Sequence, residues 1–104
     1  MIIVYTTVGS KEDALKISKQ LVGERLCACV NFFSTSSVFE WDGEMKVDDE
    51  HSMLIKTSLN FENIKERLKQ MHPYETPCII EISVENVNED YAKWVDCFCK
   101  LRSN

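Results

Sequence analysis

The dipeptide Asp42-Gly43 constrains the fold of this chain more than any other short feature of its sequence. It lies inside the run SVFEWDGEMKV, where the residues on both sides alternate in character. Asp-Gly in this context is the strongest short-range signal for a β-hairpin. The return strand is expected to continue through residues 52–57. The hairpin is then more extended than one small sheet needs, and we expect it to reach over a neighbouring subunit.

Three apolar runs predict further strands, at residues 2–7, 27–33 and 78–84. Helical patterns separate these strands, so the order is β-α-β-β-α-β followed by a last helix. This order is typical of an α+β, ferredoxin-like sandwich, here with an extended β-hairpin and a C-terminal helix. The length predicts a single domain over residues 1–104.

Each predicted helix follows a residue that can cap it, namely Ser10, Asn60 or Asn88. The first helix is expected to end near Glu24. The residues on the expected buried sides recur at helical spacing. They are Ala14, Ile17, Ser18 and Leu21 in the first helix, Phe61, Ile64, Leu68 and Met71 in the second, and Tyr91, Trp94, Val95, Phe98 and Leu101 in the last.

Both faces of the predicted sheet are apolar. Side chains alternate across a strand, so Ile2 and Val4 lie opposite Ile3 and Tyr5. The second strand likewise divides into Ala28, Val30 and Phe32 on one face and Cys27, Cys29 and Phe33 on the other. Two helices cover only one face, and a large exposed apolar patch is a liability on a monomer. We therefore expect an oligomer, with the last helix covering part of the second face.

Charge and apolar patterning exclude two kinds of partner. The net charge is −5 with no basic cluster, whereas phosphate binding requires positive charge, so we expect no nucleic-acid partner. No apolar run approaches membrane-spanning length, so we expect no membrane association. The N-terminal run MIIVYTTVGS lacks the marks of a signal peptide, which favours a cytoplasmic location. The five cysteines are then expected to be reduced, buried thiols.

The run KQMHPYETPCII contains one of only two histidines. Pro73 disfavours helix at the residue before it, so the second helix should end near His72. A histidine in the last helical turn also interacts favourably with the helix dipole when it is protonated. A binding role is compatible with this structural one, because His72, Tyr74 and Glu75 would place a donor, an amphipathic ring and an acceptor at one rim.

The other histidine, His51, lies in the acidic run DDEHSM. Such a run is usually a solvated face, although carboxylates beside an imidazole could hold a divalent cation. Lys56, near the end of the same strand, could pair with Glu50 or with a ligand anion. The sequence contains no recognisable catalytic motif. Its three glycines are too few for a phosphate-binding loop, and the G-x-S-x-G motif of a nucleophilic serine does not occur. We expect no enzymatic activity.

The sequence resembles the CutA family of divalent-cation tolerance proteins over nearly its whole length. The marks of the family occur in order along the chain. They are Ala28-Cys29-Val30-Asn31, Ser37-Val38-Phe39-Glu40-Trp41-Asp42-Gly43, Lys56-Thr57, His72-Pro73-Tyr74-Glu75-Thr76-Pro77 and the Tyr91/Trp94 pair. The resemblance implies a ferredoxin-like protomer in a tight homotrimer shaped like the PII signalling proteins. It also implies a role in tolerance of, or response to, divalent metal ions such as copper.

The resemblance further implies that a metal ion or small ligand binds in clefts between subunits. The residues expected to line this ligand cleft are Trp41, Glu50, Lys56, Tyr74 and Glu75. Glu50 stands at a position where the family pattern also has glutamate. We expect no required cofactor, although a divalent cation or copper could bind.

Copper-bound relatives are implied to use a cysteine on the first strand and a histidine pair before the proline. The matching positions here are Tyr5, Met71 and His72, of which only His72 keeps the residue type. A thioether beside an imidazole could still suit Cu(I), so Met71 and His72 are the candidate metal ligands. Cys29 or another thiol could approach them across the sheet.

Two other function classes stay open at this point. The chain could form a structural or signalling trimer that acts through protein partners and has no physiological metal. It could also be an enzyme that uses the His72 rim. A titration of the pure protein with metals and metabolites discriminates between these classes.

Overall fold

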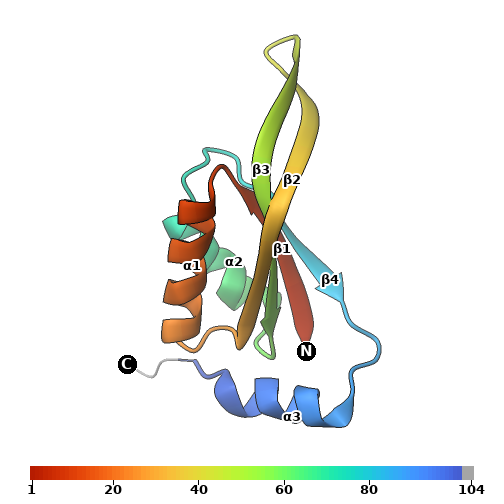
Figure 1. The fold of residues 1–104 in the computed structure, drawn as a ribbon. Helices are drawn as coiled ribbons and strands as arrows, with labels where there is room; N and C mark the ends of the chain where they lie inside the picture. The colour runs from red at the N-terminus through yellow and green to blue at the C-terminus, as the bar shows by residue number, and fades with distance from the viewer. Residues whose placement is uncertain (102–104) are drawn as a thin grey trace.

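The computed structural model describes residues 1–101; residues 102–104, the end of the predicted 1–104 domain, lie outside the described residues. Within the described part, the elements follow the predicted order (Figure 1), which confirms the α+β class. They are β1 (Ile2–Val8), α1 (Lys11–Gly23), β2 (Cys29–Trp41), β3 (Glu44–Thr57), α2 (Phe61–Met71), β4 (Ile79–Ser83) and α3 (Glu89–Phe98). None of the helices among residues 1–101 is long and apolar enough to cross a membrane.

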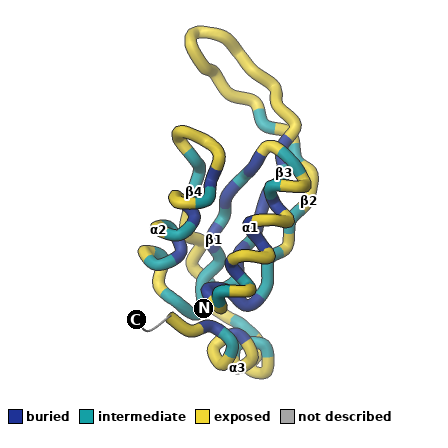
Figure 2. Tube along the Cα trace, turned by 90° about the vertical axis from the view of Figure 1, so that its left-hand side faces the viewer, coloured by how far each residue is buried: buried dark blue, intermediate teal, exposed yellow. Residues whose placement is uncertain are grey.

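The strands form one antiparallel sheet in the order β2-β3-β1-β4, as the ferredoxin-like topology requires. Both α1 and α2 lie on one face of this sheet (Figure 1). Their apolar sides pack on Val4 and Val8 of β1 and on Met53 and Ile55 of β3, and together these residues form the main core. Figure 2 shows buried stretches along β1, whereas the far part of the hairpin is mostly exposed.

The two helices on the sheet begin at the predicted capping residues. The Ser10 hydroxyl oxygen accepts a hydrogen bond from the Asp13 backbone N–H at 3.1 Å, and the Asn60 side-chain oxygen accepts one from the Asn63 N–H at 3.2 Å. The predicted stripes of both helices face the core. Their buried members are Ala14, Ile17, Ser18, Leu21, Ile64 and Leu68, and Phe61 and Met71 are partly buried.

The predicted hairpin is present and longer than expected. Asp42 and Gly43 both have positive φ angles, 52° and 76°, as a type I′ turn requires. All 13 residues of β2 pair with β3. The prediction that the strand ends at residue 33 is therefore wrong. Residues 34–37 are polar, and the strand continues because backbone pairing with β3 needs no apolar side chain.

The last helix, α3, lies across one end of the sheet (Figure 1). Its N-terminal Asn88 makes no side-chain capping hydrogen bond with the described residues. Val95 is fully buried, as predicted, but Trp94 and Leu101 are about half exposed, so their predicted burial is wrong. The reason is the position of α3 at the ends of the strands, where a helix can bury only a narrow side.

The second face of the sheet is apolar and largely uncovered within the described chain. Phe33 of β2 and Ile80 and Ile82 of β4 are each about half exposed. The last helix reaches this face only at its edge, where the Lys56 ammonium lies 5.6 Å from the centre of the Tyr91 ring. The prediction of two apolar faces is thus confirmed, and the oligomer that would cover the second face stays a prediction.

The five cysteines are free thiols in different environments. Cys27 and Cys99 are buried, Cys29 and Cys78 are intermediate and Cys97 is exposed. Alternation predicts Cys27 on the same face as Cys29 and Phe33, but Cys27 packs in the main core, because β2 starts only at Cys29 and alternation does not extend before it. Burial raises the pKa of the Cys27 thiol to about 12.

We expect a thiol reagent to modify Cys97 first and Cys27 and Cys99 last in the native protein. Both of these thiols are buried from the reagent, and the raised pKa of Cys27 leaves it with almost no thiolate, which is the reactive form. Mass spectrometry of peptides from timed labelling gives the order. The same labelling in denaturant, where all thiols react alike, is the control, and early modification of Cys27 would contradict the packing described above.

Candidate ligand cleft

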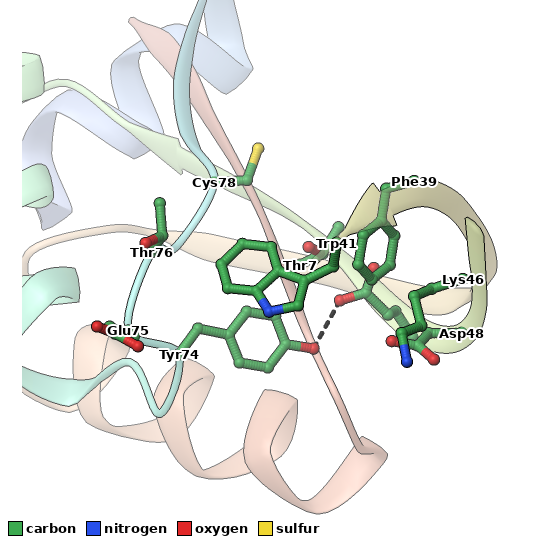
Figure 3. Close-up of a pocket in the computed structure, with 10 residues that line it drawn as sticks. Thr7, Phe39, Trp41, Lys46, Asp48, Tyr74, Glu75, Thr76 and Cys78 are labelled. Atoms are coloured by element: carbon green, nitrogen blue, oxygen red, sulfur yellow. Dashed lines mark hydrogen bonds between the residues drawn. The ribbon is translucent and has the colours of Figure 1, made fainter. Parts of the chain in front are cut away.

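A cleft of about 590 Å³ lies between the hairpin and the segment that follows α2 (Figure 3). It is lined by Thr7, Phe39, Trp41, Lys46, Asp48, Glu50, Tyr74, Glu75, Thr76 and Cys78. Four of the residues predicted for the ligand cleft, Trp41, Glu50, Tyr74 and Glu75, are among them. The fold therefore brings together two segments, 39–50 and 74–78, that are separated in the sequence by the end of β3 and by α2.

Glu50 is the buried acidic group of the cleft, with 8% of its surface exposed. Its Oε2 accepts a hydrogen bond from the Tyr74 hydroxyl at 2.6 Å (dashed line in Figure 3). Burial alone would raise the pKa of Glu50, but its polar neighbours Ser37, Tyr74 and Thr7 favour the ionised form and together lower the pKa below its ordinary value. Glu50 is thus ionised at neutral pH.

Aromatic rings form much of the remaining wall. Phe39 and Trp41 come from the far part of β2, and Tyr74 comes from the segment after α2 (Figure 3). Burial and the Glu50 carboxylate raise the pKa of Tyr74, so its phenol stays protonated as a donor. The same two causes raise the pKa of the Cys78 thiol, which therefore also stays protonated at neutral pH.

His72 lies behind the cleft wall rather than in it. Its Nε2 is 2.8 Å from the Thr7 carbonyl oxygen and 3.2 Å from the Thr6 hydroxyl oxygen, and its Nδ1 accepts a hydrogen bond from the Tyr74 backbone N–H at 3.1 Å. This pattern assigns the proton to Nε2, since Nδ1 is an acceptor and a carbonyl is never a donor. Burial lowers the pKa of His72, so the ring is neutral. It ties the end of β1 to the segment that carries Tyr74.

The predicted metal ligands Met71 and His72 do not line the cleft. Met71 packs at the edge of the main core, and both ring nitrogens of His72 are hydrogen-bonded. Among residues 1–101, no group of three or more His, Cys, Asp or Glu side chains is arranged to hold a metal ion. Copper binding at these two residues stays a prediction, and it would require a hydrogen bond of the imidazole to break.

Two expected neighbours of the site lie elsewhere. Lys56 is six residues from Glu50 along β3, about 20 Å at strand spacing, and contacts the Tyr91 ring instead. Cys29 pairs with Lys56, so it is at the same far end of the sheet and does not approach His72. The expected pairing of Lys56 with Glu50 and the approach of Cys29 to His72 are wrong, because both rested on strand membership and ignored the length of the strands. The place of Lys56 in a cleft between subunits stays a prediction.

The cleft also contains residues that the sequence analysis did not assign to it. They are Thr7, Phe39, Lys46, Asp48, Thr76 and Cys78. Three of them could have been found from the pattern of the hairpin. Asp48 and Lys46 precede Glu50 at intervals of two along β3, so they lie on its face of the strand. Phe39 faces Lys46 across the hairpin and shares that face.

The Tyr74→Phe variant is expected to unfold more easily at neutral pH. The lowered pKa of Glu50 means that its ionised form contributes stability above about pH 4.5, and this contribution is lost as the pH falls through the folded-state pKa. Removing the phenol hydroxyl should reduce the free energy of unfolding at pH 7 by about 1.5 kcal/mol, the lower end for a hydrogen bond to a charged group. The difference from wild type should shrink in acid.

Urea unfolding at several pH values measures this effect. Tyr91→Phe is the matched control, because the Tyr91 hydroxyl is buried with no hydrogen-bond partner among the described residues. It should retain wild-type stability at every pH. A Tyr74→Phe deficit that is the same in acid as at neutral pH would mean that the hydroxyl does not act through the charge of Glu50.

Comparison with known proteins shows what this chain is related to. The family model described as CutA1 divalent ion tolerance protein matches residues 2–97. The divalent-cation tolerance protein CutA of Pyrococcus horikoshii is 46% identical over 96 residues, which cover 91% of this chain and 94% of the relative. The resemblance inferred from the sequence motifs is confirmed.

Solved structures agree with this relationship. The crystal structure of CutA1 from Pyrococcus horikoshii superposes with a TM-score of 0.93 at 43% identity and covers 97% of this chain and 100% of that one. The PII-like protein CutA from Nostoc sp. PCC 7120 gives 0.90 at 31% identity, covering 98% and 100%. A structure described as the periplasmic divalent cation tolerance protein CutA from Archaeoglobus fulgidus gives 0.87 at 37% identity, covering 90% and 93%. This chain belongs to the CutA1 divalent ion tolerance family.

Proposed function

We propose that this chain acts in the tolerance of divalent cations as a non-enzymatic homotrimer, with a metal ion or small ligand bound in clefts between its subunits. The names of its relatives support the role in divalent-cation tolerance. The observation that supports a ligand site between subunits is that the cleft continues the uncovered face of the sheet. Thr7 and Ser52 pair on that face, and Glu50 precedes Ser52 by two residues on β3, so it lies on the same face.

Two uncovered surfaces support the assembly. The second face of the sheet exposes Phe33, Ile80 and Ile82, and such a patch usually marks an interface. The far part of the hairpin exposes a second apolar set, with Val38 paired to Val47, and no helix of the described chain reaches it. A neighbouring subunit against the sheet face would cover the first set and close the cleft. The PII-like description of the Nostoc neighbour favours an oligomer of this kind.

The chemistry of the cleft favours a positively charged ligand. Glu50 is an ionised carboxylate, and Asp48 and Glu75 add further negative charge around it. Copper at Met71 and His72 is a second location for a metal ion, and we expect weaker binding there because the imidazole must first release a hydrogen bond. The proposal requires no cofactor.

The rival function is a structural or signalling trimer that acts through protein partners without a physiological metal. The cellular location is a related question. We propose the cytoplasm on the basis of the five free cysteines, although one structural neighbour is described as periplasmic. Detection of the protein in cell fractions, with cytoplasmic and periplasmic marker proteins as controls, tests the location.

The function is tested by light scattering and by calorimetric titration with Cu²⁺ and Zn²⁺ after thiols are blocked. A trimer that binds one of these ions, and that loses binding in Glu50→Gln or in His72→Ala, supports the proposal and identifies the site. A trimer that binds neither ion favours the rival function. A folded monomer at micromolar concentration would overturn the assembly and the inter-subunit cleft together.

A further inference from the structure

We propose that the cleft binds an organic cation, an amine or guanidinium group on an apolar body, with the Glu50 carboxylate as its counter-charge and aromatic rings as its walls. This inference rests on the proposed function, since it takes the cleft to be the ligand site. It goes further by naming the chemical class of the ligand.

The first observation is that Glu50 is a buried anion without a cationic partner. Its carboxylate accepts a hydrogen bond from the Tyr74 hydroxyl, and within residues 1–101 no Lys, Arg or His nitrogen lies within 4.0 Å of it. Buried charges in proteins are usually paired, because an isolated charge is costly to remove from water. The Tyr74 hydroxyl that donates to Glu50 is neutral, so this hydrogen bond leaves the charge uncompensated. A bound cation would compensate it.

The second observation is the aromatic lining. Phe39 and Trp41 reach the cleft from the hairpin, and Tyr74 reaches it from the segment after α2 (Figure 3). An aromatic face attracts an ammonium or guanidinium group within about 6 Å of its centre, and such rings are the usual walls of sites for organic cations. The volume of about 590 Å³ is within the range of small-molecule sites.

The third observation is the balance of charge around the cleft. Asp48, Glu50 and Glu75 line it against a single base, Lys46, whose ammonium pairs with Glu44 outside the cleft at 3.5 Å. This excess of negative charge disfavours an anionic ligand such as a nucleotide. A hard metal ion needs several oxygen ligands gathered around one point, and among residues 1–101 no group of three or more His, Cys, Asp or Glu side chains is arranged in this way. An organic cation uses the rings and the carboxylate together.

Calorimetric titration of the wild-type protein with benzylamine and with benzyl alcohol tests the inference. The two probes have nearly the same shape, and only the amine is charged at neutral pH. We expect benzylamine to bind about tenfold more tightly than the alcohol or better. Equal affinity for the two probes would overturn the inference, because the cleft would then recognise only apolar shape.

Three variants locate the interaction. Glu50→Gln keeps the shape of the side chain and should remove most of the preference for the amine. Asp49→Asn, the matched control, removes the same charge from the next residue, which does not line the cleft, and should leave the preference intact. Trp41→Leu keeps an apolar wall without a π face and should weaken benzylamine several-fold while changing benzyl alcohol little. If both Glu50→Gln and Trp41→Leu still bind benzylamine more tightly than benzyl alcohol to the same extent as wild type, the amine binds outside the cleft and the inference is overturned.

The metal titration separates failure of this inference from failure of the proposed function. If Cu²⁺ or Zn²⁺ binds through Glu50 while benzylamine shows no preference over the alcohol, the organic-cation class is wrong and the proposed function stands. If benzylamine binds through Glu50 and neither metal binds, the inference stands and a direct role of the protein in binding metal fails. Circular dichroism of each variant confirms that it is folded, and Trp41→Leu keeps the test decisive should Glu50→Gln fail to fold.

Discussion

Ile82→Asp is expected to convert the assembled protein into monomers. Ile82 lies on the second face of the sheet, opposite Ile3 of β1, and is 42% exposed in the single chain. In the proposed trimer this face is buried, so the aspartate would be an unpaired charge in an apolar interface. Leaving such a charge uncompensated costs about 3–5 kcal/mol, and symmetry repeats the change at every interface. Few assemblies of small subunits tolerate that loss.

Light scattering across a range of protein concentrations measures this effect. Leu15→Asp is the matched control, because Leu15 is 41% exposed but lies on α1, on the other side of the sheet. The control introduces the same charge at the same exposure and should stay assembled. If Ile82→Asp keeps the wild-type mass, the second face is not the interface.

The hairpin turn and the first two helix starts were predictable because their signals are local. Asp42 and Gly43 adopt positive φ angles that few other residue pairs accept, and Ser10 and Asn60 bond to backbone groups only three residues away. The length of β2 was not predictable in this way. Its polar residues 34–37 become a strand through pairing with β3, which is a tertiary influence on a segment with no apolar pattern of its own.

The face on which a residue lies was predictable only inside a strand. Alternation correctly places Val4 and Tyr5 on opposite faces, and in the structure Val4 lies in the core. The same rule fails at Cys27, since it was applied to a residue that precedes the sheet. For α3 the periodicity gave the correct direction, with Val95 inward, but it could not reveal that the helix meets only the end of the sheet and leaves Trp94 half exposed.

The cleft was predictable in its parts but not as a whole. Tyr74 and Glu75 stood out in a motif, and Glu50 matched a family position. Their meeting depends on the length of the hairpin, which brings Trp41 and Glu50 to the segment after α2, and no spacing in the sequence reports that contact. His72, the most conspicuous residue of the sequence, does not line the cleft but supports the segment that carries Tyr74.

His72→Ala is expected to lower the free energy of unfolding by about 2–4 kcal/mol in metal-free protein. The substitution leaves the Thr7 carbonyl and the Tyr74 N–H without their partner and opens a cavity at a buried site. If His72 served chiefly as a metal ligand, its loss would matter little in the presence of a chelator. Urea unfolding of both proteins with a chelator present distinguishes the two roles.

The stabilisation by His72 should also depend on pH. Burial, opposed more weakly by the Thr7 carbonyl and by Asp13 and Glu50, lowers the folded-state pKa of His72 below its ordinary value of 6.5. The unfolded chain therefore takes up the proton at a higher pH than the folded one. The stability from His72 is complete above about pH 6.5 and is lost as the pH falls through the folded-state pKa. Protonation of Nδ1 would also remove the acceptor of the Tyr74 N–H, so this hydrogen bond would be lost.

Two replacements separate the hydrogen bonds that His72 makes. In His72→Asn the side-chain oxygen can accept from the Tyr74 N–H in place of Nδ1, and in His72→Gln the longer amide can donate to the Thr7 carbonyl in place of Nε2. Each should recover part of the stability that His72→Ala loses. Neither side chain titrates, so the loss of stability just below about pH 6.5 should disappear in both. Wild-type stability of His72→Ala with a chelator present, or an unchanged acid response in both amide variants, would show that His72 does not anchor the segment carrying Tyr74 and would return it to the candidate copper ligands.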